Sequence, residues 1–141
     1  MVGLHLILGV TVIAANLLAG AWGAAAWYWR KPSVGFWYVL RFAQLAVVLQ
    51  VAIGGLLLLL GEAAADLHYV YGVLPLLISL LAEGARSTAS EHELEGLDFE
   101  SLPRERQGAI ASAIVRRETG IMAVSALVIV GLTLRAAAIQ L

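Results

Sequence analysis

The chain has 141 residues, of which 61% are hydrophobic and 13% charged, and its formal net charge is −1. Soluble domains are usually about half apolar and about a quarter charged, so this composition excludes an ordinary soluble domain and indicates an integral membrane protein. The absence of cysteine excludes both a disulfide framework and covalent CxxCH attachment of a haem. We expect the surroundings of the chain to be the lipid bilayer and not a nucleic acid.

Four apolar runs have about the 20 residues that a helix needs to cross the hydrocarbon core of a bilayer. A cleaved signal peptide is the alternative for the first run, but no Lys or Arg precedes it and its apolar stretch is too long. Short connections make an all-α, up-down-up-down four-helix bundle the expected fold, in one transmembrane domain. We expect its helices at about 3–27, 36–60, 67–84 and 119–139.

Small and polar residues recur at spacings of three and four along each apolar run. In a membrane such faces pack against neighbouring helices, because small residues let backbones approach and polar residues find partners there. The predicted faces are His5, Gly9, Val12, Asn16, Ala19, Gly20 and Gly23 in the first run, Ala43, Ala46, Gln50 and Gly54 in the second, His68, Gly72, Pro75, Ser79 and Ala82 in the third, and Gly120, Ala123, Leu127, Gly131 and Arg135 in the fourth.

The connection over about 85–118 is rich in Ser, Glu and Asp as far as residue 101, which predicts a solvated loop. Ser101 and Pro103 then resemble the start of a helix. We therefore expect the second half to be helical, either lying on the membrane surface or extending the fourth run. His92 stands among glutamates with no second His or Cys nearby, which favours an exposed residue over a metal ligand.

Eight of the nine basic residues lie in or beside the connections at about 28–35 and 85–118. The positive-inside rule therefore places both connections in the cytoplasm, and both termini and the Gly61–Asp66 turn outside. We expect a multi-pass protein of a bacterial inner (plasma) membrane. An interfacial aromatic belt is predicted beside the first connection, from Trp27, Tyr28, Trp29, Phe36, Trp37 and Tyr38.

Two histidines open two of the apolar runs in the same way, each followed four residues later by glycine, in His5–Gly9 and His68–Gly72. The first and third runs cross the membrane in the same direction, so both histidines are expected at one depth near the outer leaflet. Two imidazoles at equal height on parallel helices can hold a haem iron, and the glycines leave room for the porphyrin edge. We predict that His5 and His68 are the metal ligands of a b-type haem.

Arg135 is the only basic residue expected on the outer side. There it either pairs with a haem propionate or snorkels at the end of its helix. The histidines have other interpretations as well. His5 can be an interfacial residue, His68 can contact Asp66, or the pair can bind zinc or copper together with Glu62 and Asp66.

Three short motifs occur in order: His5-Leu6-Ile7-Leu8-Gly9, then Leu49-Gln50-Val51-Ala52-Ile53-Gly54-Gly55, and after a short outer turn Leu67-His68-Tyr69. In these motifs the first three runs resemble one half of a haem A synthase. The resemblance implies that His5 and His68 ligate a b-type haem and that Gln50 and Gly54 line the adjoining helix.

That family has two such halves in one chain, one of them for the substrate haem, and a carboxylate in an outer loop. Here there is a single half, and its extra helix follows the histidine pair, so oxidation of a haem methyl group is not expected. The rest of the chain is similar to small uncharacterised four-helix membrane proteins of high-GC bacteria, a resemblance that implies no activity.

The expected function is that of a cytochrome b-like protein in electron transfer or haem handling. Its partner would be a quinol or another membrane redox subunit, and a homo-oligomer is left open. No independent catalytic constellation is visible, which argues against an enzyme. The rival is a cofactor-free structural or assembly subunit of a larger complex, with which the small-residue faces agree equally. A transporter would need an oligomer, because there is no broken helix pair and Arg41 can snorkel.

Overall fold

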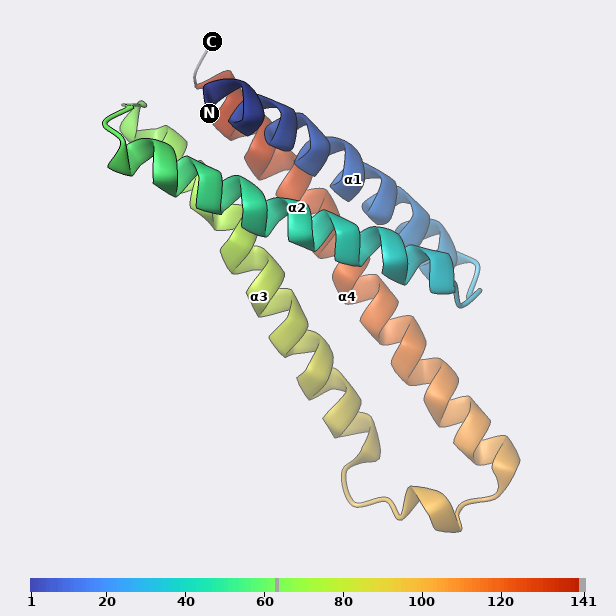
Figure 1. The fold of residues 1–141 in the computed structure, drawn as a ribbon. Helices are drawn as coiled ribbons and strands as arrows, with labels where there is room; N and C mark the ends of the chain where they lie inside the picture. The colour runs from blue at the N-terminus through green and yellow to red at the C-terminus, as the bar shows by residue number, and fades with distance from the viewer. Residues whose placement is uncertain (63, 140–141) are drawn as a thin grey trace.

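The computed structural model describes residues 1–62 and 64–139, and confirms the all-α class. It consists of four long helices, with the single 3-10 turn η1 (Phe99–Ser101) before the last: α1 (Val2–Tyr28), α2 (Val34–Leu59), α3 (Asp66–Leu94) and α4 (Arg104–Ala138). All four are long and apolar enough to cross a membrane. Successive helices run in opposite directions, so the start of α1 and the end of α4 lie together (Figure 1).

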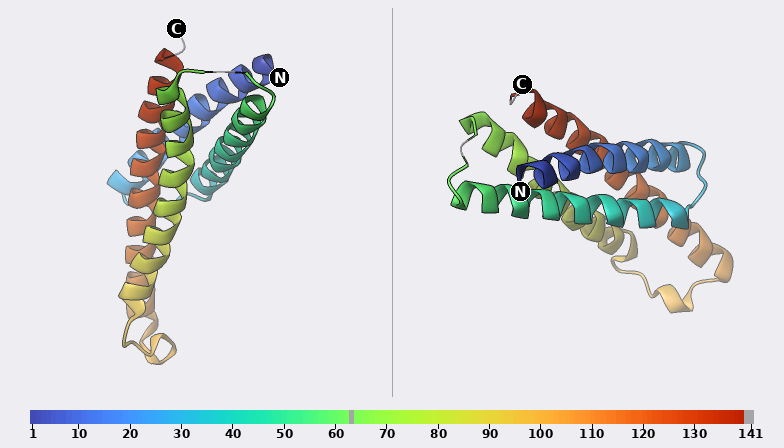
Figure 2. Two further views of the ribbon diagram at one scale, coloured as in Figure 1. Left: turned by 90° about the vertical axis from the view of Figure 1, so that its left-hand side faces the viewer. Right: turned by 45° about the horizontal axis from the view of Figure 1, so that its top comes forward.

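Helix α4 is the centre of the arrangement, because it packs along both α1 and α3. Helix α1 also packs along α2, whereas α2 makes few contacts with α3. The α1–α2 pair lies beside only one half of α3 and α4 and crosses them at an angle (Figure 2). The other half of α3 and α4, joined through η1, projects beyond the pair as a helical hairpin, which we call the projecting hairpin (Figures 1 and 2).

The projecting hairpin is more helical than the sequence predicted. Helix α3 passes the expected end at residue 84 and continues to Leu94, so the expected solvated loop shrinks to 95–103. Ion pairs stabilise the extra turns: Arg86 contacts Glu83 at 2.9 Å within α3, and Arg117 of α4 contacts Glu93 at 3.0 Å. Opposite charges three residues apart support a helix, so a charged stretch that looks solvated in sequence is helical here. The helical second half extends the fourth predicted run.

Small residues form much of the interior of the bundle, as their spacing predicted for most positions of the first two runs. On the fourth run Gly120 and Ala123 are buried as predicted, whereas Leu127, Gly131 and Arg135 are exposed, so the predicted face was wrong at these three positions. A Cβ atom at Gly20 would lie 2.6 Å from Leu127 Cδ2, and one at Gly23 would lie 2.5 Å from Phe36 Cε2. These two glycines therefore let α1 approach its neighbours closely. Among the most deeply buried residues are Val12, Asn16, Ala19, Ala43, Ala46, Ala123 and Ala126.

Large apolar side chains point outward instead. Leu59 is 85% exposed and Leu81 is 69% exposed, and many other leucines and valines are exposed as well. Small residues inside and large apolar residues outside are the pattern expected where the surroundings are hydrocarbon, because burying apolar groups there brings no gain over lipid contact.

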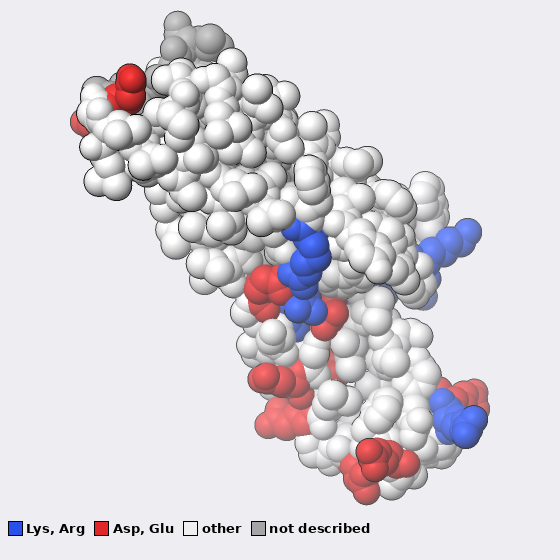
Figure 3. Space-filling model, viewed as in Figure 1, with Lys and Arg blue, Asp and Glu red and all other residues white. Residues whose placement is uncertain are grey.

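Charged side chains are confined to particular regions of the surface. In Figure 3 acidic side chains mark the end where α2 turns into α3, and charges of both signs cover the middle of the molecule and the projecting hairpin. The surface between these regions shows no Lys, Arg, Asp or Glu on this face (Figure 3). An uncharged band of this kind matches the four helices that are long enough to cross a membrane.

Candidate functional site

One end of the bundle brings together polar groups from all four helices, and we call it the histidine end: His5, Gln50, Gly54, His68 and Ala136. The imidazole rings of His5 and His68 lie with their centroids 6.0 Å apart and their planes inclined by 60°. An imidazole nitrogen lies about 2 Å from a metal that it binds, so two rings on opposite sides of one metal have centroids about 6 Å apart. The observed spacing of the two rings matches that value.

The ring of His68 is held in one tautomer. Its Nδ1 lies 3.0 Å from the backbone carbonyl oxygen of Ala136. A carbonyl only accepts, so Nδ1 carries the proton and donates it, and Nε2 keeps its lone pair. Ala136 lies in the last turn of α4, where carbonyls have no helical partner. Metal-binding histidines usually donate their second ring N–H to a carbonyl in this way, which fixes the ring and its tautomer. This contact turns His68 toward α4 and not toward Asp66.

The ring of His5 contacts Gln50 of α2, with 3.2 Å between the Nε2 atoms of the two side chains. The amide nitrogen is a donor, so the Nε2 atom of His5 accepts and the ring proton is on Nδ1. That Nδ1 and the Oε1 atom of Gln50 are both buried without a hydrogen-bond partner. Buried polar atoms are nearly always paired, so two such atoms on contacting side chains mark an incomplete network.

The glycines of this end differ in what covers them. A Cβ at Gly54 would lie 3.0 Å from His5 Cε1, so the imidazole ring packs against this backbone. A Cβ at Gly9 would lie 3.2 Å from the Nε2 atom of Gln50, whereas nothing lies within 4 Å of one at Gly72. The space expected for a porphyrin edge is therefore open beside Gly72, but beside Gly9 it holds the Gln50 amide.

The residues present fit a haem iron in their donor atoms. Both imidazoles carry a lone pair on Nε2, and only a flexible amide covers one of the two flanking glycines. The end of a glutamine side chain can turn aside by rotation about its single bonds. Freeing the Nε2 atom of His5 for a metal therefore asks for a rotation of the Gln50 side chain.

Arg135 lies at the same end of the molecule. Its guanidinium carbon is 5.9 Å from the centroid of the Tyr71 ring, and Tyr71 is three residues beyond His68 on α3. Within residues 1–62 and 64–139 no carboxylate pairs with Arg135. Its side chain is exposed, and its predicted contact with a haem propionate stays a prediction.

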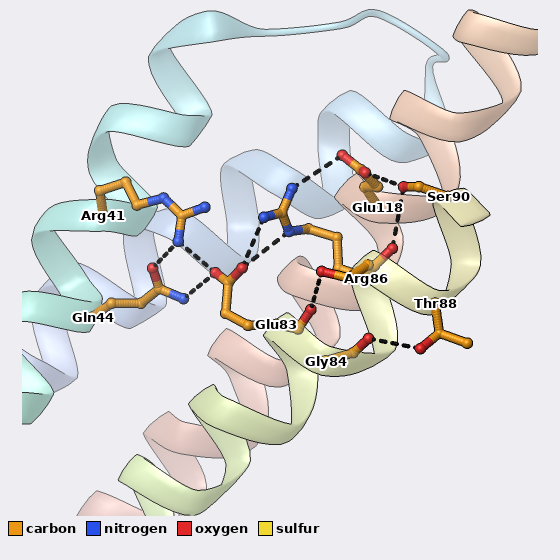
Figure 4. A network of polar contacts seen from close by, with 9 residues as sticks. Arg41, Gln44, Glu83, Gly84, Arg86, Thr88, Ser90 and Glu118 are labelled. Atoms are coloured by element: carbon orange, nitrogen blue, oxygen red, sulfur yellow. Dashed lines mark hydrogen bonds and ion pairs between the residues drawn. The ribbon is translucent and has the colours of Figure 1, made fainter.

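A second polar cluster joins α2, α3 and α4 at the start of the projecting hairpin, and we call it the charged cluster. The carboxylate of Glu83 accepts hydrogen bonds from Arg41, from Gln44 at 2.8 Å and from Arg86 at 2.9 and 3.0 Å. The cluster consists of Arg41, Gln44, Glu83, Arg86, Ser90 and Glu118 (Figure 4).

The second carboxylate of the charged cluster belongs to Glu118. It accepts from Ser90 and, at 3.5 Å, from Arg86, which also stacks 5.5 Å from the centroid of the Trp37 ring. Two arginines and two glutamates thus balance in charge, and each has partners on another helix. The cluster therefore links α2, α3 and α4 through ion pairs and hydrogen bonds.

Sequence reasoning missed the charged cluster, because it treated Arg41 as a residue that snorkels and left Glu83 and Glu118 unassigned. A signal was available: Arg41, Glu83 and Glu118 all lie at those ends of their apolar runs that face the 28–35 and 85–118 connections. Opposite charges at one level of neighbouring helices are expected to pair, since an unpaired charge near hydrocarbon is costly.

The structure gives less support to the other two metal hypotheses, which concern His92 and a zinc or copper site. His92 Nδ1 lies 3.1 Å from Glu95 Oε2, and both side chains are well exposed. Over the part of the chain that the structure describes, no group of three or more His, Cys, Asp or Glu side chains is placed to hold a metal ion. The zinc or copper hypothesis, in which Glu62 and Asp66 complete the set with the histidines, therefore lacks an assembled ligand set.

No known protein family, curated protein or solved structure matches the chain. The resemblance to one half of a haem A synthase thus remains a prediction from the three short motifs.

Proposed function

We propose that this chain is a multi-pass membrane protein that binds one b-type haem through His5 and His68. The observation that carries the proposal is the 6.0 Å separation of two imidazole rings from α1 and α3. The contacts with Gln50 and Ala136 assign the lone pair of both rings to Nε2, and the Nε2 atom of His5 can bind a metal once the Gln50 amide turns away from it.

The number of donors also favours haem over a bare metal ion. Zinc sites need three or four protein ligands, and the described residues bring together only the two imidazoles. A haem iron already has its equatorial positions filled by the macrocycle, so two histidines complete it. When bound, such an iron supplies one-electron chemistry and leaves no open position for a substrate, which favours electron transfer or haem handling over an enzyme reaction.

The chain's own residues would hold and tune this group. The carbonyl of Ala136 orients His68, and the amide of Gln50 would give up its contact with the Nε2 atom of His5. Arg135, exposed at the same end beside Tyr71, supplies a cation for a propionate. The two lone-pair nitrogens, their burial and this positive charge would together set the reduction potential.

The proposal includes an orientation. Connections 28–35 and 85–118 carry most of the basic residues, so we place them and the projecting hairpin in the cytoplasm of a bacterium, with the histidine end at the outer face of the plasma membrane. A haem at that depth can exchange electrons with a quinol or with another membrane redox subunit.

A visible absorption spectrum tests the proposal. We expect the protein, expressed with ample haem and purified in detergent, to show low-spin b-type bands that sharpen on reduction with dithionite. His5→Ala and His68→Ala should each abolish the low-spin bands, because one imidazole cannot fill both axial positions. His92→Ala is the matched control, since His92 is an exposed residue of the projecting hairpin, and should leave the spectrum unchanged. A colourless wild-type protein would refute haem binding.

The second candidate is a cofactor-free structural or assembly subunit. It is favoured by glycines outside the packed interior, since nothing lies within 4 Å of a Cβ built at Gly55 or Gly131. Such open small-residue positions let a helix of another subunit approach closely. The same spectra separate the two candidates, because only the haem proposal requires a coloured protein.

A further inference from the structure

A cavity of about 250 Å³ lies between the α1–α2 connection and the middle of α4. It is far from the histidine end, and it shares no residue with the proposed haem site. Its polar and aromatic lining consists of Trp27, Arg30, Lys31, Ser112, Arg116 and Thr119. Three of these six side chains are cations.

The three cations are not neutralised by carboxylates of the described residues. The ion pairs of the described residues involve Arg41, Arg86, Arg117 and His92, and none of them involves a cavity cation. Arg116 stacks on the indole of Trp27, with its guanidinium carbon 6.0 Å from the ring centroid. A guanidinium stacked by its face keeps its N–H edge free for an anion.

The backbone at Arg30 gives an independent indication. Helix α1 ends in a Schellman motif, in which the N–H groups of Arg30 and Lys31 bond back to Trp27 and Ala26 at 3.4 and 3.0 Å. Arg30 occupies its left-handed position with φ +55°, and is the only non-glycine described with positive φ. Glycine is the usual residue there, because a Cβ is strained in this conformation. Arg30 thus occupies a position at which glycine would make the protein more stable, and this strain indicates a role for the arginine side chain.

Exposed aromatic rings next to the cavity-lining Trp27 are of the kind that lies at the depth of lipid headgroups. Tyr28 and Trp29, which follow Trp27 in the chain, are 77% and 66% exposed, as amphipathic rings at a membrane interface would be. Trp27 also lines a second, wider cavity whose other residues include Ile78, Leu81, Ile121 and Val124. A molecule with a charged end and an apolar tail would thus meet the cations and, past Trp27, an apolar surface.

We propose that this cavity binds the phosphate group of an anionic membrane lipid, with Arg30, Lys31 and Arg116 as the residues that recognise it. Basic pockets between helices at a membrane interface are suited to such headgroups, and arginine pairs with phosphate in a bidentate manner. The apolar second cavity favours a lipid over a soluble phosphate. The inference needs α1 and α4 to lie in a membrane, and it does not depend on haem.

The test is a lipid titration of the full chain in detergent, followed by native mass spectrometry and thermal unfolding. Phosphatidylglycerol or cardiolipin should bind and raise the melting temperature, and phosphatidylcholine should not. Arg30→Gly and Arg116→Gln should each weaken binding about tenfold, as loss of one charge-assisted contact does. Arg106→Gln, which removes a cation of the projecting hairpin outside the cavity, is the matched control and should leave lipid binding unchanged.

Arg30→Gly also separates binding from folding. Glycine relieves the strain at φ +55°, so the lipid-free variant should melt no lower than the wild-type protein, while a given concentration of anionic lipid should stabilise it less. Equal lipid stabilisation of the wild type, Arg30→Gly and Arg116→Gln would overturn the proposal. So would an equal stabilisation by glycerol 3-phosphate or inorganic phosphate, because the ligand would then be a soluble anion. The haem spectrum should be unaffected in all these variants.

Discussion

The histidine end and the charged cluster are the two places where polar side chains gather inside this apolar bundle, and they are built in opposite ways. In the charged cluster every ionic group has a partner, and Glu83 alone accepts from three side chains. At the histidine end, two atoms of the contacting side chains of His5 and Gln50 are buried without partners.

The difference separates structure from function. A complete network contributes stability and has no capacity left for a ligand, whereas an incomplete one costs stability unless something completes it. Metal ligands and their neighbours are expected to form an incomplete network of this kind. Substitutions at the histidine end and in the charged cluster should therefore differ in their effects on folding and on haem binding.

Replacement of Glu83 by alanine should be the most destabilising. It would leave Arg41 and Arg86 without their shared carboxylate, and hydrogen bonds to charged groups contribute roughly 1.5–3 kcal/mol, so we expect the free energy of unfolding to fall by about 2–3 kcal/mol. Unfolding in mixed micelles measures it. Glu91→Ala, on an exposed position of the same helix, is the control and should cost less than about 0.5 kcal/mol. Equal effects of the two substitutions would show that the charged cluster does not hold the helices together.

Gly23→Ala should have the next largest effect, since it acts on the packing of α1 against α2 and α4. The added Cβ would lie 2.5 Å from Phe36 Cε2 and 2.9 Å from the Cβ of Ala123, so α1 must shift, at about 1–3 kcal/mol for overpacking. Gly55→Ala is the matched substitution on α2, where the same Cβ meets open space. It should be neutral or slightly stabilising in the same micelle assay. A small cost at Gly23 would contradict the close approach of α1 to its neighbours.

Gln50→Leu should cost less than about 1 kcal/mol, although it also removes a half-buried polar group. The substitution eliminates the unpartnered Oε1 atom, and loss of an already unsatisfied acceptor is nearly neutral. It also frees the Nε2 atom of His5, so haem should be retained. Haem titration and unfolding of the same sample measure both effects. A loss of stability as large as that of Glu83→Ala would mean that the network at the histidine end is complete.

Arg135→Gln should have the smallest effect on folding, because the side chain is exposed and pairs with no carboxylate of the described residues. Removing a positive charge near the iron favours the oxidised state, so the reduction potential should fall while the low-spin bands remain. A spectroelectrochemical titration against Arg106→Gln measures the shift. An unchanged potential would remove Arg135 from the site and leave it as a snorkelling residue.

Much of the fold could be predicted from the sequence, because it follows from hydrophobic run lengths and from small residues at helical spacing. Val12, Asn16, Ala19, Gly20 and Gly23 lie on the buried face of α1, as their spacing indicated. The length of α3 could not be predicted in this way. Hydropathy falls at the first charges, and the ion pairs that join this stretch to the other helices depend on the fold: Arg41 with Glu83, Arg86 with Glu118 and Arg117 with Glu93.

The candidate site was predictable in part. The repeated His-x-x-x-Gly pattern pointed to His5 and His68, which the fold brings together, and the Leu-Gln…Gly-Gly motif pointed to Gln50 and Gly54. The contact between His68 and the Ala136 carbonyl had no sequence signal, because a backbone carbonyl at the end of a helix is the same for every residue type. The amide of Gln50 over Gly9 likewise depends on a side-chain rotamer.

The most direct test of the central claim is electron paramagnetic resonance of the oxidised protein together with its haem-to-chain ratio. If His5 and His68 of one chain ligate one iron, the spectrum should be low-spin ferric with one haem per chain, and either histidine-to-alanine substitution should remove that low-spin signal. A high-spin spectrum of the wild-type protein, or a low-spin signal that survives His68→Ala, would contradict the account.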